Sequence, residues 1–143
     1  MSFVLDASVA LTWLLKDASE KNDPYAFGVL KTLRAEESRC SVPVTWALEV
    51  ANVIARCEAK AQVTEAQSGA FLELLQELAI ELDAASAERS LSNTLQLARQ
   101  HRISAYDASY LELALRLSLP LATLEGDLRR AADKAGVKAY KPR

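Results

Sequence analysis

The chain has 143 residues, of which half are hydrophobic and a quarter are charged, a composition that excludes a disordered chain. Its 4 glycines and 4 prolines exclude collagen-like and low-complexity classes. A formal net charge of −2 argues against a protein that coats nucleic acid through a general basic surface, because such binding needs lysines and arginines that neutralise phosphates. The length fits one domain, which we expect to span residues 1–143.

The first part of the chain predicts a strand followed by two helices. A short apolar run at residues 3–5 indicates a buried strand. Ser8 is then expected to cap a short helix, and the polar stretch 17–23 is expected to be a loop. Pro24 suits the first turn of a helix that runs to about residue 35 and buries Phe27, Leu30 and Leu33.

A surface connection over 36–39 leads to the second predicted strand, at residues 40–44, with Pro43 at a strand end or edge. Thr45 is expected to cap a helix over 46–60, whose apolar side would be formed by Leu48, Val50, Val53 and Ile54. The spacing of Thr64 and Gln67 is that of a capping box, so the next helix is expected to run from residue 64 to about residue 78.

The second half of the chain continues this alternation. A third strand is expected at 78–82, followed by helices over about 86–101 and 104–117. A short strand at 120–123, a helix over 125–135 that ends at Gly136, and a last strand near 137–140 complete the prediction. Strands that alternate with helices favour an α/β fold, namely a three-layer α/β/α sandwich around a central, mostly parallel sheet.

Cysteine usage and hydropathy indicate a cellular compartment. Cys40 and Cys57 lie in apolar surroundings without ligand or disulfide spacing, so we expect two free buried thiols in a reducing cytosol. The chain reaches an acid at Asp6, unlike a secretory leader, and its apolar stretches fall far below the roughly 20 residues that span a bilayer. We therefore expect a cytoplasmic protein with no membrane partner.

Several acids are expected at strand ends or in the first turns of the following helices: Asp6, Glu49, Asp107, Glu125 and Asp127. Taken singly, each also suits a helix cap, a turn or the positive end of a helix dipole. In a parallel sheet, however, such positions meet at one edge. Carboxylates gathered there would repel one another unless a cation lay among them.

The available ligands indicate which cation. His101 is the single histidine, and at the end of a predicted helix it is explained by the helix dipole, so it is not a candidate base. Because neither cysteine has a ligand-spaced partner, a zinc site is not expected. A site made of carboxylate oxygens suits Mg²⁺ or Mn²⁺, ions that commonly serve phosphoryl chemistry.

Short motifs in a fixed order resemble the PIN domain family, and most closely its VapC-type toxin ribonucleases from bacterial toxin–antitoxin systems. The motifs are Val4-Leu5-Asp6-Ala7-Ser8, Glu49 after Val44-Thr45, Ser104-Ala105-Tyr106-Asp107-Ala108, and the segment from Leu121 to Ala132. The resemblance spans residues 3 to about 137. It implies a PIN-like sandwich, a Mg²⁺- or Mn²⁺-dependent endoribonuclease, a homodimer, and a cognate antitoxin protein that inserts a segment near the acidic pocket.

The resemblance also implies residue roles. Asp6 and Asp107 match the two central metal aspartates of the family, and Glu49 matches its glutamate after the second strand. Hydroxyl residues beside the metal site are matched by Ser8 and Thr123. The usual Thr-x-Asp of the family is here Thr123-Leu124-Glu125, so the fourth acid is either Glu125 or Asp127.

Together these observations predict metal-assisted hydrolysis of an RNA phosphodiester by a cation-activated water, without a protein nucleophile. The metal ligands would be Asp6, Asp107, Glu49 and Glu125, and Asp127 would join them in the catalytic set. The alternative is a catalytically impaired binding module that docks a partner protein in the acidic pocket. A phosphatase of the haloacid-dehalogenase type is disfavoured because no Asp-x-Asp follows the first strand.

Basic residues are concentrated at the end of the sequence. From Arg129 onward it contains 6 lysines and arginines and a single acidic residue, Asp133. Arg129 and Arg130 start this segment beside the acidic motif, so they are the candidate RNA contacts, the alternative being a solvated helix face. Trp13, Trp46 and the apolar helices are expected to contribute a hydrophobic surface for self-association. The net charge of −2 therefore still permits an enzyme that holds one phosphate group through a metal.

Overall fold

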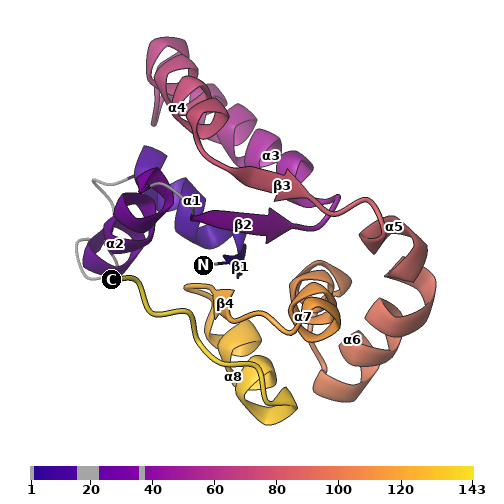
Figure 1. The fold of residues 1–143 in the computed structure, drawn as a ribbon. Coiled ribbons are helices and arrows are strands. Elements are labelled where there is room, and N and C mark those ends of the chain that lie inside the picture. The colour runs from indigo at the N-terminus through magenta and orange to yellow at the C-terminus, as the bar shows by residue number, and fades with distance from the viewer. Residues whose placement is uncertain (1, 16–22, 36–37) are drawn as a thin grey trace.

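The computed structural model describes residues 2–15, 23–35 and 38–143, which form an α/β fold (Figure 1). The predicted three-layer α/β/α arrangement around a parallel sheet is confirmed. In chain order the elements are β1 (Ser2–Leu5), α1 (Ala7–Leu14), α2 (Asp23–Arg34), β2 (Arg39–Val42), α3 (Trp46–Ala59), α4 (Glu65–Glu77), β3 (Ile80–Leu82), α5 (Ser86–Arg89), the π-helical segment η1 (Ser90–Thr94), α6 (Leu95–His101), α7 (Ala105–Leu117), β4 (Leu121–Ala122) and α8 (Gly126–Ala135).

The described strands form one parallel sheet in the order β3-β2-β1-β4. Phe3 pairs with Cys40 of β2, and Val4 pairs with Leu121 of β4. The chain moves outward from β1 through β2 to β3, and then places β4 on the opposite side of β1. Strand order therefore reverses between β1 and β4, which is where open parallel sheets form sites at the carboxyl ends of their strands.

Helices cover both faces of this sheet (Figure 1). On one side α1 contacts α2, α3 and α4, whereas on the other α7 contacts β1 and β4 and carries η1 and α6 on its outer side. The segment after α8 runs back to α2, where the Tyr25 hydroxyl donates a hydrogen bond of 2.8 Å to the carbonyl of Tyr140. Among the described helices, none has both the length and the apolar character needed to cross a membrane.

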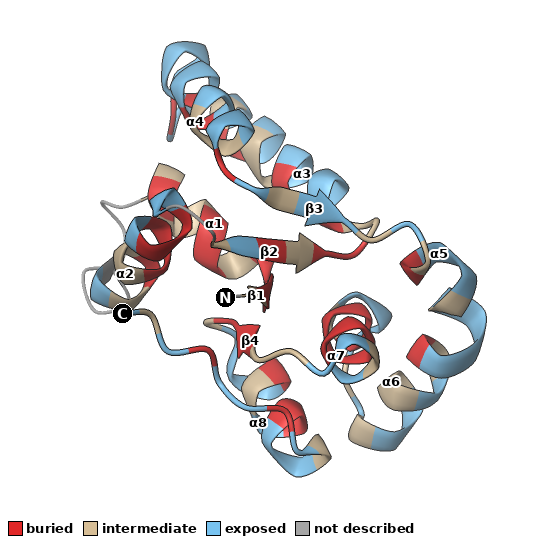
Figure 2. Ribbon diagram, in the orientation of Figure 1, coloured by how far each residue is buried: buried red, intermediate tan, exposed pale blue. Residues whose placement is uncertain are grey.

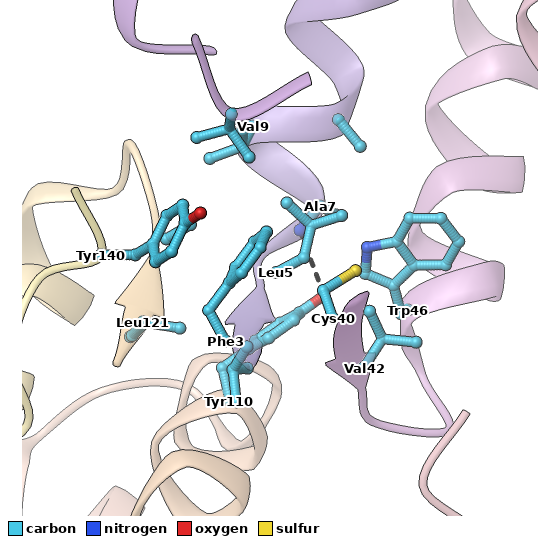
Figure 3. Close-up of a cluster of buried hydrophobic side chains, with 14 of the residues drawn as sticks. Phe3, Leu5, Ala7, Val9, Cys40, Val42, Trp46, Tyr110, Leu121 and Tyr140 are labelled. Carbon is cyan, nitrogen blue, oxygen red and sulfur yellow. Dashed lines mark hydrogen bonds between the residues drawn. The ribbon is translucent and has the colours of Figure 1, made fainter. Parts of the chain in front are cut away.

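The core is centred on β1, whose Phe3, Val4 and Leu5 have no exposed surface (Figure 2). The apolar run that predicts this strand is continuous because helices cover both faces of the sheet. Phe3 stacks on Tyr140 with ring centroids 3.8 Å apart, and Tyr110 of α7 extends beside Leu5 (Figure 3). These contacts fix the end of β1, from which the next residue, Asp6, enters the site.

The two tryptophans do not form a surface for self-association, contrary to the prediction. Trp13 and Trp46 are each only 7% exposed, and the indole nitrogen of Trp13 donates to the carbonyl of Ala26 at 2.8 Å. Both are therefore core residues. The most exposed large apolar side chains are instead Leu91 at 88% and Leu48 at 74%.

Helix caps are predicted with mixed success. The capping box of Thr64 and Gln67 is present at the start of α4. Ser8, however, lies inside α1, because Asp6 takes the N-cap position. Thr45 is the N-cap of α3 but makes no side-chain capping bond, since its backbone is already helical at φ −79° and ψ −15°. Cys40 and Cys57 are free and buried, as predicted.

Other expectations also differ from the structure. The sequence predicts Leu48 on the apolar side of its helix, but in the structure this side chain is exposed. The helix expected over 86–101 contains the π segment η1, and the last strand is reduced to one bridge between Leu121 and Ala139. Most of the loop at 17–23 and part of the connection at 36–39 lie outside the described residues, although Asp23 begins α2 and Arg39 begins β2.

Candidate functional site

A cavity of about 590 Å³ opens where α3, the start of α7 and the segment before α8 meet, at the carboxyl end of the sheet. We call it the acidic cavity. It is lined by Thr45, Leu48, Glu49, Asn52, Ser104, Tyr106, Asp107 and Glu125. Asp6 is 3% exposed, and its charge raises the pKa values of Glu49 and Asp107, so it belongs to the same group of acids.

Asp6 is held by two hydroxyl groups from the strand ends. The Ser8 hydroxyl donates to Asp6 Oδ2 at 2.6 Å, and the Thr123 hydroxyl donates to the same oxygen at 2.7 Å. Each hydroxyl also accepts a backbone N–H at 3.0 Å, Ser8 from Leu124 and Thr123 from Glu125. These bonds join the end of β1 to the end of β4, and they leave Asp6 Oδ1 without a side-chain donor among the described residues.

Glu49, in the first turn of α3, is oriented by a tyrosine that the sequence analysis missed. The Tyr110 hydroxyl donates to Glu49 Oε1 at 2.8 Å and accepts the N–H of Ala7 at 3.4 Å, the bond dashed in Figure 3. Tyr110 is completely buried. Its position three residues after Asp107 was the available signal, because that spacing places both side chains on one face of α7.

Asp107 takes part both in the N-terminal cap of α7 and in the acidic cavity, two roles that the sequence offers as alternatives. Its backbone N–H donates to the Ser104 hydroxyl at 3.0 Å, so Ser104 is the true N-cap of α7. Because the capping bond uses the backbone of Asp107, its half-buried carboxylate remains free to line the acidic cavity.

The two candidates for the fourth acid, Glu125 and Asp127, line different cavities. Glu125 lines the acidic cavity together with Glu49 and Asp107. Asp127 instead lines a neighbouring cavity, where it forms an ion pair with Arg130.

The two predicted RNA contacts, Arg129 and Arg130, also differ in their surroundings. The Arg129 guanidinium points inward and donates to the backbone carbonyls of Leu121 at 3.3 Å and Val137 at 3.0 Å. It also pairs with Asp133. Arg130 remains on the surface with 70% of its side chain exposed. Arg129 therefore ties α8 to the end of the chain, and Arg130 alone of this pair is free to face a ligand.

Electrostatic repulsion characterises the acidic cavity. Burial raises the pKa of Asp6, Glu49 and Asp107, and the neighbouring carboxylates raise these values further. For Asp107 the pKa reaches about 6. Burial and the same carboxylates raise the pKa of Tyr110, which keeps its hydroxyl protonated as a donor. The ion pairs between described residues include none of Asp6, Glu49, Asp107 and Glu125.

The residues present fit a divalent cation. Thr45 Oγ1 is buried at the lining of the cavity without a hydrogen-bond partner in the described structure, next to an oxygen-rich donor set. No three histidine, cysteine, aspartate or glutamate side chains within residues 2–15, 23–35 and 38–143 already form a metal-binding group. A donor set made of carboxylate and hydroxyl oxygens is the kind that Mg²⁺ takes, since this ion keeps several waters and binds through only one or two carboxylates.

Comparison with known proteins identifies both a family and a fold. A family model described as PIN domain matches residues 3–134. The crystal structure of PAE2754 from Pyrobaculum aerophilum is similar with a TM-score of 0.62 and 20% sequence identity, and the match covers 92% of this chain and 87% of that chain. At this identity the likeness concerns the fold. No curated protein matched the sequence.

Proposed function

Because the chain belongs to the PIN domain family, whose fold is of the nuclease type, we propose that it is a Mg²⁺- or Mn²⁺-dependent endoribonuclease. The observation that carries this proposal is the convergence of Asp6, Glu49, Asp107 and Glu125 without a basic partner among the described residues. Buried carboxylates that lie close together repel one another and lower the stability of the fold, and a bound cation removes this repulsion.

In the proposed site, Asp6 and Asp107 would hold the cation, and Glu49 and Glu125 would complete its surroundings. A divalent cation bound there would supply an activated water and neutralise charge on the phosphate. Asp6 presents Oδ1, because both hydroxyl donors occupy its Oδ2. Tyr110 fixes Glu49 by donating to Oε1, so the second carboxylate oxygen can accept a proton or a water.

We further propose Glu125, rather than Asp127, as the fourth acid. Support comes from its place in the lining of the acidic cavity and from the contribution of its charge to the raised pKa values of Asp6, Glu49 and Asp107. Asp127 is already paired with Arg130. Replacing Glu125 with glutamine should therefore reduce cleavage much more than replacing Asp127 with asparagine.

The decisive experiment is cleavage of RNA by purified wild-type protein and by Asp6→Asn, with Mg²⁺, with Mn²⁺ and with a chelator. We expect the wild type to cleave only with metal and Asp6→Asn to be inactive while unfolding at a similar temperature. Glu73→Gln removes an exposed carboxylate on α4 and should retain full activity. Full activity of Asp6→Asn would refute the proposal, and a binding module that lacks catalysis would show no cleavage under any condition.

At the biological level, we propose a toxin of the VapC type that is inhibited by a cognate antitoxin protein and acts as a homodimer in the cytoplasm. The motifs around Asp6, Asp107 and Glu125 support this assignment, and the free cysteines suit a reducing compartment. Induced expression of the wild type should arrest bacterial growth, whereas Asp6→Asn should not. Coexpression of a small gene directly upstream should restore growth, and light scattering should give twice the monomer mass.

A further inference from the structure

A second cavity, of about 600 Å³, adjoins the acidic one, and we call it the basic cavity. It lies between the end of α6, the link to α7 and one face of α8. Its charged lining consists of His101, Arg102, Arg130 and Lys134, opposed by Asp127. Three full positive charges and an imidazole thus face one carboxylate, in a chain whose net charge is negative.

The charged groups of the basic cavity are accessible to a ligand. Arg102, Arg130 and Lys134 are all exposed, and they come from two parts of the fold, the end of α6 and α8. The pair between Arg130 and Asp127 is exposed on both sides, at 70% and 72%. An ion pair in that setting contributes little to stability, so the Arg130 guanidinium can exchange Asp127 for an anionic ligand.

The basic and acidic cavities share two stretches of chain. In the link before α7, Ile103 lines the basic cavity and the next residue, Ser104, lines the acidic one. Before and within α8, Glu125 lines the acidic cavity and Asp127 lines the basic one. The Asp127 charge also raises the pKa of Asp107, which reflects their proximity. The two cavities are therefore neighbours, and a chain of phosphates bound in the acidic cavity can extend into the basic one.

We propose that the basic cavity binds a backbone phosphate of the RNA, adjacent along the strand to the phosphodiester that is cleaved. This inference rests on the proposed ribonuclease function and names the part of the substrate that this second cavity holds. Guanidinium groups of Arg102 and Arg130 match the oxygens of a phosphate in a bidentate arrangement, and Lys134 adds a point charge. The carboxylates of the acidic cavity would repel RNA, so a nearby cationic contact is needed to hold the strand.

The backbone of Arg102 makes an unusually clean test possible. Arg102 is the C-cap of α6 in the left-handed conformation, with φ 55° and ψ 47°, where glycine is favoured. Arg102→Gly therefore removes the side chain without straining the fold, and its melting temperature should equal or exceed that of the wild type. Combined with Lys134→Ala, it removes two cationic contacts from the basic cavity.

The experiment measures binding of a labelled short single-stranded RNA by fluorescence anisotropy, in a chelator so that cleavage cannot interfere, over a range of salt concentrations. For Arg102→Gly with Lys134→Ala we expect roughly tenfold weaker binding at low salt. The slope of log affinity against log salt should decrease by about 0.7 for each lost contact. The matched control, Lys31→Ala with Lys60→Ala, removes two exposed lysines outside both cavities and should leave affinity and slope unchanged.

Three outcomes decide the inference. A wild-type affinity and slope in the basic-cavity variant would overturn it. It would also be wrong if that variant lost binding of inorganic phosphate, measured by calorimetry, but kept its affinity for RNA, because the cavity would then serve a free anion. If the wild type binds RNA through these residues but never cleaves it with Mg²⁺ or Mn²⁺, the proposed enzymatic function fails and the phosphate contact stands.

Discussion

At the residue scale, the carboxylates of the acidic cavity oppose folding at neutral pH unless a cation is bound. Burial, and then the charges of Asp6 and Glu125, raise the pKa of Asp107 from an ordinary 3.8 to about 6. The folded protein therefore holds this proton more tightly than the unfolded chain does. The contribution of Asp107 to the free energy of unfolding is therefore fully present below about pH 4, and it is lost as the pH rises through about 6.

Asp107→Asn should consequently stabilise the metal-free protein in a pH-dependent way. With a chelator present, we expect its melting temperature to exceed that of the wild type by roughly 3 °C at about pH 8 and by almost nothing near pH 4. Scanning calorimetry across this pH range measures the difference. Glu73→Gln, at an exposed site, should show no such trend, and an equal gain for Asp107→Asn at both pH values would contradict repulsion as its cause.

Tyr110→Phe should lower activity through Glu49 without removing any acid. The Tyr110 hydrogen bond lowers the pKa of Glu49, so its loss should move the acidic limb of the pH–rate profile to higher pH. We expect roughly tenfold slower RNA cleavage and about 1 kcal/mol less stability.

The matched control is Tyr25→Phe, which also removes a donated hydrogen bond of 2.8 Å, here to the carbonyl of Tyr140. It should lose similar stability but keep the rate and the pH profile of the wild type. If the two variants behave alike in cleavage, Tyr110 has only a structural role.

Individual residues of the site differ in how far the sequence predicts them. The acids are predictable because each follows a strand or opens a helix, and the parallel topology brings such positions together. The spacing of Tyr110 from Asp107 places it on the same face of α7, but its bond to Glu49 depends on the distance between α3 and α7, which the sequence does not give. Arg129 and Arg130 are neighbours in sequence, and only the packing of α8 shows that one points inward and the other outward.

At the scale of elements, α7 connects the fold to the site. It is capped at Ser104, carries Asp107 and Tyr110 toward the acidic cavity, and packs against β1 and β4. Near its other end, Arg116 binds Glu112 at 2.8 Å and Asp83, just after β3, at 2.6 Å. Both ends of α7 are thus fixed, which keeps its first turn in place beneath the cavity.

Ser104→Ala should disturb both the helix and the site. Loss of the N-cap should cost about 1 kcal/mol of unfolding free energy, measured by urea denaturation, and should reduce metal-dependent cleavage because Asp107 lies in the freed turn. Thr64→Ala removes the equivalent cap of α4, far from the acids, and should cost similar stability with no change in cleavage. Equal cleavage by both variants would show that the first turn of α7 does not position Asp107.

Elements with strong local signals are predictable, and those that depend on neighbours are not. The capping box of α4 and the end of α8 at Gly136, with φ 83°, need only local chemistry. The π segment Ser90–Thr94 contacts α7, and Ala139 forms a single bridge to Leu121 of β4, and no local sequence pattern records either of these contacts. Leu48 fits a helical apolar stripe, yet it borders a cavity instead of the core.

At the scale of the whole molecule, the alternation of strands and helices predicts the parallel sheet and its two covering layers, but not the position of β4. That position is set by bonds between distant segments, including the amide of Asp6 to the carbonyl of Ala122 at 2.9 Å. Strand order in turn determines that the acids meet between β1 and β4.

Added Mg²⁺ or Mn²⁺ should stabilise the whole protein, because the proposed ligands meet only in the folded state. At a metal concentration of about 100 times Kd, the gain should be about 2.7 kcal/mol. The gain should be smaller at about pH 5 than at about pH 8, since protonated Asp107 competes with the metal. Differential scanning fluorimetry of the wild type and of Asp6→Asn measures this, and an equal metal response in both proteins would contradict the assignment of Asp6.

The hydroxyl bridges between the strand ends also determine when the site can form during synthesis. Thr123 donates to Asp6 across 117 positions of chain, and Glu125 follows only two residues later. A polypeptide still emerging from the ribosome therefore contains Asp6, Glu49 and Asp107 without the strand that clamps the first of them or the acid that completes the set. The acidic site of the proposed ribonuclease can therefore assemble only after the segment that carries Thr123 and Glu125 has been synthesised.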